Sequence, residues 1–160
     1  MTVLNIVKVG ENVLRKKAEN VKKIDLKIKE FCQDMIETMY CYKGIGLAAV
    51  QVSVLKNIIV VDIAPEKKKP IIIINPKIIK MEGKIKGVEG CLSVPGREGS
   101  VERAKIIILG YIDLQGKKKV ITAEGLLARV IKHEIDHLNG VLFIDKIIEE
   151  IIDDNSRLSL

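Results

Sequence analysis

The chain has no tryptophan, and only two phenylalanines and three tyrosines among its 160 residues. The core must therefore be aliphatic, and few rings are available for stacking on nucleic-acid bases. No apolar run approaches the roughly 18 residues of a membrane span, since the stretch Ile71 to Ile74 is only strand-sized. We therefore expect no membrane partner and no sequence-specific binding of nucleic acid.

Cysteine is also scarce, with Cys32, Cys41 and Cys91 as its three positions. An odd number of cysteines, in a chain without a secretory signal after Met1, argues against a disulfide framework. Cys32 and Cys41 fall in a helical apolar pattern and are expected to be small core residues. The absence of a signal or transit segment predicts a cytoplasmic protein of bacterial type.

Basic residues outnumber acidic ones by 27 to 21, which gives a net charge of +6. This excess permits an anionic partner, but the lysines are scattered along the chain. The one dense run, Lys67-Lys68-Lys69, precedes Pro70 and is typical of an exposed turn. We interpret the positive charge as a solvated lysine-rich surface.

The order of hydrophobic patterns predicts one α+β domain over residues 1–160, with mixed or antiparallel strands packed around a central helix. Asp25 is the expected cap of a first helix, which ends near Tyr40. The other expected elements are a helical turn at 12–17, strands at 57–62 and 71–75 (ended by Pro76), a hairpin or bent strand at 77–86, a hairpin of strands 105–113 and 117–123, a helix at 124–138, a short helix after Asp145, and frayed residues 155–160.

Both histidines of the chain lie in one segment, His133-Glu134-Ile135-Asp136-His137. On a helix, positions i and i+4 share a face, so the two imidazoles can bind one metal ion. Glu134, next to the first histidine, can act as general base on a metal-bound water. Asp136 either orients a histidine or lies exposed to solvent.

A third metal ligand is needed, because catalytic sites of this type have three protein ligands and an open position. Phe143 stands where the metzincin pattern requires its third histidine, and Glu149 comes too early for the thermolysin pattern. A cysteine or another carboxylate must then serve. Cys91 is the best candidate, because glycines and a proline flank it, although it could instead be a buried structural thiol. A Cys₁His₂ set suits Zn²⁺ or Fe²⁺.

The glycine-rich segment from Gly44 to Gln51 is the third region of interest. Its glycines and alanines would let a substrate backbone approach closely. Gln51 carries an amide that could donate to an oxyanion. Without further context, a glycine-rich loop before a strand is more often a tight turn, and this segment lacks the Lys-Ser/Thr ending of a phosphate-binding P-loop.

Taken together, the segments 44–51, 89–93 and 133–138 resemble, in order and spacing, the three motifs of the peptide deformylase family. The resemblance extends from Leu14 to Phe143. It implies a peptide deformylase-like α+β hydrolase that removes the formyl group from the N-terminal formylmethionine of newly made proteins and releases formate.

The resemblance also implies a site. One divalent metal ion per chain would be held by Cys91, His133 and His137, with Fe²⁺ as the expected metal in the cell and Zn²⁺, Ni²⁺ or Co²⁺ as alternatives. Glu134 would be the general acid/base. The side-chain amide of Gln51 and the backbone N–H of Leu92 would stabilise the oxyanion.

The implied partner is an N-formylmethionyl nascent peptide, extended along a groove lined by Gly46 and Gly90. Val130 and the aliphatic part of Arg129 are expected to line the methionine pocket. By analogy alone, the lysine-rich surface and the segment 147–151 would touch the ribosome.

Three positions depart from the family pattern: Val50 replaces proline, Ser53 replaces glycine, and Lys132 replaces glutamine and is expected to face outward. Two other hypotheses remain open at this point. One is a small metallopeptidase with the His-Glu-x-x-His motif, and the other is a basic metal-binding module without enzymatic activity.

Overall fold

The computed structural model describes residues 2–151, so the expected fraying of 155–160 lies outside it. Its two long helices are α1 (Leu26–Cys41) and α2 (Leu126–Leu138). Four short 3₁₀ helices are η1 (Asn12–Arg15), η2 (Ala49–Val52), η3 (Pro65–Lys67) and η4 (Phe143–Asp145). The strands are β1 (Gly46–Ala48), β2 (Ile58–Val61), β3 (Ile71–Glu82), β4 (Ile85–Cys91), β5 (Val94–Arg103), β6 (Ile106–Ile112), β7 (Lys118–Glu124) and β8 (Ile147–Ile151).

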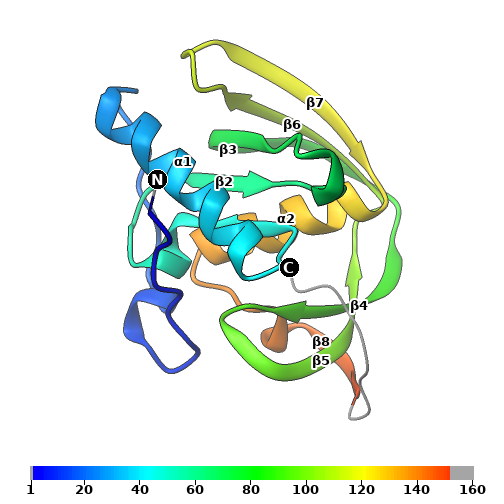
Figure 1. The fold of residues 1–160 in the computed structure, drawn as a ribbon. Coiled ribbons are helices and arrows are strands. Elements are labelled where there is room, and N and C mark those ends of the chain that lie inside the picture. The colour runs from blue at the N-terminus through cyan, green and yellow to red at the C-terminus, as the bar shows by residue number, and fades with distance from the viewer. Residues whose placement is uncertain (1, 152–160) are drawn as a thin grey trace.

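The strands form two sheets, one with the order β1-β2-β3-β6-β7 and one with the order β4-β5-β8 (Figure 1). Every pair of neighbouring strands is antiparallel. The predicted α+β class, with antiparallel strands packed around a central helix, is therefore confirmed. No helix of the described residues is long and apolar enough to cross a membrane.

Strand β2 is buried on both faces, which explains why its four residues are all aliphatic. Ile58 and Val60 belong to one apolar cluster with the buried face of α1. Ile59 and Val61 belong to a second cluster, which α2 shares with both sheets. Because side chains alternate along a strand, one face of β2 packs toward α1 and the other toward α2. Strand β2 therefore lies between the two helices, and α2 lies in the middle of the molecule.

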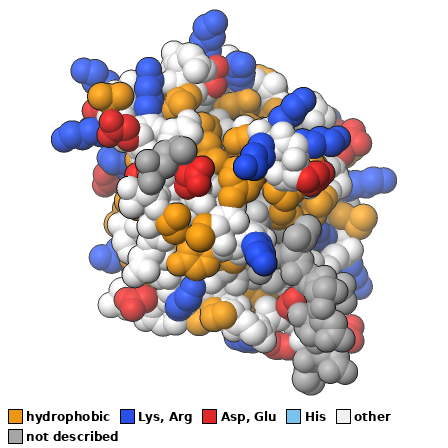
Figure 2. Space-filling view, viewed as in Figure 1, with side chains coloured by type: hydrophobic (Ala, Val, Ile, Leu, Met, Phe, Trp, Pro, Cys, Tyr) orange, Lys and Arg blue, Asp and Glu red, His pale blue; other side chains and the backbone are white. Residues whose placement is uncertain are grey.

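Helix α1 begins as predicted, with the Asp25 carboxylate accepting a hydrogen bond from the Ile28 N–H at 3.0 Å. The expected core residue Cys32 is fully buried, and burial raises the pKa of its thiol to about 12. The prediction was wrong for Cys41, which ends α1 and is exposed. The lysine and arginine side chains on the face shown in Figure 2 are scattered among other side chains, which agrees with a solvated surface.

The predicted end of a strand at Pro76 was wrong, because β3 runs through it. The ladder between β3 and β6 shifts register between Ile74 and Lys77, and Asn75 has a φ of 51°. Such a bulge accommodates a proline, which cannot donate to the ladder. Of the two alternatives for 77–86, the hairpin was wrong, since β3 pairs with β6 whereas β4 pairs with β5 in the other sheet.

The short helix expected after Asp145 is instead strand β8, which pairs with β5. Gly99 of β5 explains the preference, because a Cβ atom there would lie 2.8 Å from Ile147. The absence of that atom lets the β-branched isoleucine pack flat on the neighbouring strand. The helical turn at 12–17, the helix at 124–138 and the hairpin of β6 and β7 were predicted correctly.

Candidate metal centre

Helix α2 places His133 and His137 one turn apart on a buried face. Their ring centroids are 5.0 Å apart. The face is buried because α2 packs against the residues of both sheets in one apolar cluster. The imidazoles are thus fixed by the helix and shielded from bulk water, as an i, i+4 metal-ligand pair requires.

Cys91, the last residue of β4, meets these histidines. The β4–β5 ladder shifts register between Gly90 and Cys91, and the Cys91 Sγ atom lies 3.3 Å from Nε2 of His137. One ligand atom from each of Cys91, His133 and His137 lies within 4.8 Å of the other two. The structure therefore brings together the three residues that the sequence suggested as metal ligands.

Several buried polar atoms here have no hydrogen-bond partner among the described residues. They are Nε2 of His133, Nδ1 of His137 and both carboxylate oxygens of Glu134. An unpaired buried polar atom costs about 1–3 kcal/mol, so a cluster of four indicates that something else satisfies them. One thiolate and two imidazoles with one open coordination position fit a divalent transition metal and its water.

The protonation states at the site follow from burial. Burial lowers the pKa of both imidazoles, and the neighbouring His133 lowers that of His137 further. Both rings are therefore neutral, which is the form that binds metals. Burial, and secondarily the charge of Glu134, raises the pKa of the Cys91 thiol. Burial likewise raises the pKa of Glu134 well above its ordinary value.

Glu89 orients the candidate ligand His133. Its carboxylate accepts two hydrogen bonds from Arg103 at 2.7 and 2.8 Å and one from Arg129 at 2.6 Å. His133 Nδ1 lies 2.8 Å from the same carboxylate, so this nitrogen donates and Nε2 is left for a metal. Burial would raise the pKa of Glu89, but the bonds from Arg103 and His133 outweigh it and hold that pKa below its ordinary range.

Sequence reasoning assigned no role to Glu89 or Arg103. Glu89 stands two residues before the thiol, which is a weak signal at best. Nothing in the sequence distinguishes Arg103 from the exposed basic residues, although its side chain is only 1% exposed.

Asp136 neither orients a histidine nor lies exposed. Its carboxylate accepts hydrogen bonds from Arg103 at 2.7 Å and Lys132 at 2.5 Å, and Lys146 Nζ lies 2.9 Å from it. The Lys132 side chain, which is 20% exposed, turns along α2 to pair with Asp136 one helical turn later. An i, i+4 pair of opposite charge favours this conformation.

Gln51 comes from η2 and lies beside the thiol. Its Oε1 accepts from the Ala48 N–H at 2.9 Å, while Nε2 donates to Ser93 Oγ at 3.1 Å and lies 3.7 Å from Cys91 Sγ. The amide is thus oriented with its N–H₂ group toward the candidate metal centre. Leu92, directly after Cys91, accepts a hydrogen bond from Lys8 through its carbonyl.

Gly46 lies in β1, an edge strand of its sheet, and faces α2. A Cβ atom on Gly46 would lie 2.6 Å from Glu134 Oε2 and 2.7 Å from Val130 Cγ1. Gly90, in β4, has ordinary space around its Cα. The guanidinium of Arg129 binds Glu89 and the carbonyls of Ile85 and Val101.

We expect Gly46→Ala to reduce catalytic turnover by at least about tenfold, since displacing a catalytic side chain by 1 Å can lower the rate about 100-fold. The added methyl group must push the Glu134 carboxylate or Val130 away from β1. Metal content, measured by elemental analysis, should stay at one ion per chain. Gly110→Ala in β6 is the control, because its nearest atom would be 3.5 Å away. Equal turnover in both variants would show that the Gly46 contact is unimportant.

We expect Glu89→Gln to lower the free energy of unfolding by about 3–5 kcal/mol, because it leaves two buried arginines without their shared charge. The depressed pKa adds a pH dependence. Glu89 stabilises the fold above its unfolded pKa of about 4.3, and this contribution is lost as the pH falls below that value. Urea unfolding at several pH values measures both effects. Glu102→Gln, whose partner Lys84 is 4.0 Å away at the surface, should cost about 0–1 kcal/mol.

Comparison with known proteins agrees with this geometry. The family model for polypeptide deformylase matches residues 3–151. A peptide deformylase from Endomicrobium trichonymphae is 52% identical over 145 residues, 91% of this chain and 86% of that protein. One from Dictyoglomus thermophilum is 50% identical over 150 residues, 94% of this chain and 96% of that protein. The crystal structure of the Thermotoga maritima peptide deformylase superposes with a TM-score of 0.88 at 41% identity, over 92% of this chain and 99% of that chain.

Proposed function

Because the chain belongs to the polypeptide deformylase family and so removes the formyl group from the N-terminal methionine of newly made proteins, we propose that Cys91, His133 and His137 hold the metal ion of that reaction. The observation that carries this assignment is their convergence, with all three ligand atoms within 4.8 Å of one another. The matches to peptide deformylases do not favour the metallopeptidase alternative.

We propose that Glu134 carries the proton. A divalent metal at this site, when bound, lowers the pKa of a coordinated water and polarises the formyl oxygen. Glu134 lies one residue after a ligand, with both carboxylate oxygens free of hydrogen bonds among the described residues. Its burial raises its pKa well above its ordinary value, which is the direction that suits a general acid/base. It accepts the proton of water and returns one to the departing amine nitrogen.

The Gln51 amide and the Leu92 N–H are the proposed donors to the oxyanion. Gln51 is held by two hydrogen bonds, one at each end of its amide. A donor that is already oriented needs no rearrangement as negative charge develops, and one such donor is typically worth about 3–4 kcal/mol. Leu92 follows the ligand Cys91, so its backbone lies at the same point of the β4–β5 turn.

The peptide is proposed to pair with the free edge of β1. Within the described part of the chain, Gly46 to Ala48 pair only with β2, since β1 is the end strand of its sheet. An extended peptide added there is recognised through its backbone, which tolerates varied side chains. Gly46 lies against Glu134, and Gly90 belongs to the strand that carries Cys91. Formyl bears only hydrogen on its carbonyl carbon, so a confined site selects it by shape.

Val130, beside Gly46, is the proposed wall of the methionine pocket. The hydrocarbon part of Arg129 is proposed to line the same pocket, since its guanidinium is anchored to Glu89 on the β4–β5 side. Residues 1–160 are proposed to form one catalytic domain in the bacterial cytoplasm. The metal in the cell is proposed to be Fe²⁺, with Zn²⁺, Ni²⁺ and Co²⁺ as substitutes, and the lysine-rich surface is proposed to contact the ribosome.

Formate release tests the function. Protein purified without oxygen and loaded with Fe²⁺ or Ni²⁺ should release one formate per molecule of a formyl-Met peptide. The acetyl-Met form of the same peptide should stay intact, because its acyl carbon carries a methyl group. Release of amino acids from the unformylated peptide would indicate a peptidase instead. Elemental analysis of the same oxygen-free preparation identifies the metal.

A further inference from the structure

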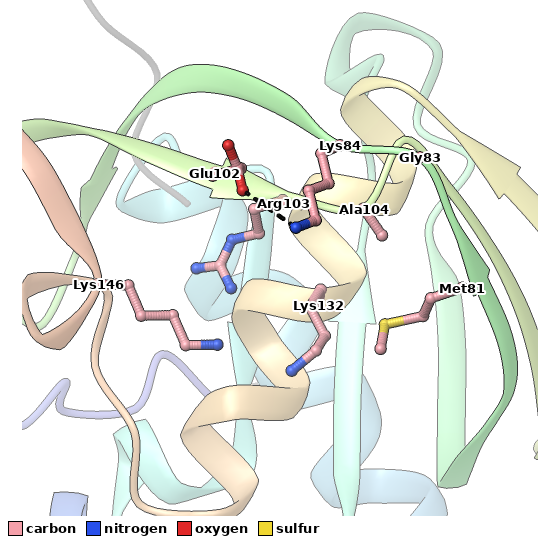
Figure 3. A pocket seen from close by; sticks show the side chains of 8 residues that line it. All are labelled: Met81, Gly83, Lys84, Glu102, Arg103, Ala104, Lys132 and Lys146. Atoms are coloured by element: carbon pink, nitrogen blue, oxygen red, sulfur yellow. Dashed lines mark ion pairs between the residues drawn. The ribbon is translucent and has the colours of Figure 1, made fainter.

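A cavity of about 460 Å³ lies beside α2, between the β3–β4 turn and the end of β5 (Figure 3). Four of its eight lining residues are basic, namely Lys84, Arg103, Lys132 and Lys146. Among the lining residues that the structure describes, only Glu102 is acidic. None of the lining residues belongs to the proposed metal ligands, the proton carrier or the oxyanion donors, so the cavity is a separate feature.

The ion pairs around the cavity leave positive charge in excess. Asp136 is shared by three cations, and Glu89 is shared by two arginines. Glu102 lies 4.0 Å from Lys84. Taken together, these ion pairs contain five cations (Lys84, Arg103, Arg129, Lys132 and Lys146) and three carboxylates (Glu89, Glu102 and Asp136). Two positive charges therefore remain without a counter-charge in these ion pairs.

Hydrogen-bond donors are also in excess. An ammonium group has three N–H donors, and Lys132 and Lys146 each direct one of them to Asp136. Figure 3 shows the side-chain nitrogens of Lys132 and Lys146 converging below the Arg103 guanidinium. The lysine side chains are 20% and 38% exposed, so both reach solvent through the cavity.

The inner wall of the cavity contains a guanidinium group that is already fixed in position. The Arg103 side chain is 1% exposed and is fixed by Glu89 on one side and Asp136 on the other. A buried guanidinium held in this way does not need to be ordered when a ligand arrives, which lowers the entropic cost of binding. This fixed guanidinium distinguishes the cavity from the basic side chains scattered over the surface in Figure 2.

We propose that this cavity binds a phosphate dianion, as inorganic phosphate or as the phosphate of a small phosphomonoester. A phosphate group of this type carries about −1.5 to −2 charges at pH 7 and three acceptor oxygens, which matches both the charge and the donor excess. A phosphodiester carries one negative charge and matches less well. The volume falls within the range of about 300–1,000 Å³ typical of small-molecule sites, so there is room for an attached organic group.

Isothermal titration calorimetry of the metal-loaded protein tests the proposal, with inorganic phosphate, methyl phosphate and dimethyl phosphate as probes at constant ionic strength. Phosphate and methyl phosphate should each bind one per chain with a dissociation constant of about 1 mM or lower. Dimethyl phosphate should bind at least tenfold more weakly. The double variant Lys132→Gln/Lys146→Gln should bind phosphate at least tenfold more weakly, and the control Lys23→Gln, an exposed lysine before α1, should bind it normally.

Three results would overturn the proposal: no saturable binding of phosphate, unchanged binding in the double variant, or equal binding of the diester. The second result would also be seen if phosphate bound at the catalytic metal instead, because neither lysine is a metal ligand. If the double variant does not fold, as judged by circular dichroism, Lys84→Gln replaces it. Among residues 2–151, the only ion pair of Lys84 is the 4.0 Å contact with Glu102, and this variant should also weaken phosphate binding.

Discussion

Glu134→Ala should keep one metal ion per chain and lose at least about 100-fold in kcat, within the range of about 10²–10⁴ typical of a general acid/base. The carboxylate is fully buried and has no hydrogen-bond partner among the described residues, so its removal breaks no ion pair there. The loss should therefore appear in turnover and not in metal binding. Formate release and elemental analysis of the same preparation measure the two quantities.

Two control variants make this result specific. Glu134→Gln keeps the size of the side chain and removes its ability to carry a proton, so it should be nearly as inactive as the alanine variant. Glu66→Ala, at an exposed position in η3, should be fully active. Substantial formate release by Glu134→Gln would remove the proton-carrying role from Glu134.

The comparison of sequence and structure shows why local patterns succeeded where they did. The helix carrying His133 and His137 was predictable because three local signals indicate the same helix. These are the helical spacing of its apolar residues, the i, i+4 spacing of its histidines and the helix-ending pair Asn139-Gly140. Strand β2 was predictable because four aliphatic residues in a row favour a buried strand. These signals are local, so no knowledge of the partner segments was needed.

The failures in the strands and at Arg103 depend on partners that are distant in the sequence. Ile147 and Ile151 fit a helix or a strand by pattern alone, and the neighbouring Gly99 in β5 decides for the strand. The passage of β3 through Pro76 depends on its bulge against β6. Arg103 has the same local appearance as an exposed basic residue, and only the fold shows that it joins Glu89 to Asp136.

The metal centre combines both kinds of information. The two histidines come from one helix, whereas Cys91 is 42 residues earlier than His133 in the chain. The motifs indicated that a third ligand is needed and that Cys91 could supply it. Only the fold shows that Cys91 Sγ lies 3.3 Å from His137 Nε2. The identity of this ligand has the largest consequence for the site, because it determines its charge and its need for a deprotonated thiol.

Cys91→Ala should weaken metal binding by more than about 100-fold, since loss of an outer-shell partner alone typically costs about 10–100-fold and this change deletes a ligand. It should also remove a proton-release signal. Burial raises the pKa of the Cys91 thiol in the metal-free protein, whereas a metal binds the thiolate. Metal binding near neutral pH should thus release about one proton from Cys91, and affinity should rise about tenfold per pH unit while the thiol is protonated.

Competition with a metal-sensitive dye measures the affinity, and titration in weak buffer measures the released proton. Cys41→Ala is the matched control, because Cys41 is an exposed thiol at the end of α1 and should change neither quantity. The histidines contribute no proton to this signal, since burial lowers the pKa of both rings and keeps them neutral. An unchanged affinity and proton count in Cys91→Ala would exclude the thiol as a ligand and leave the two imidazoles with a different third partner.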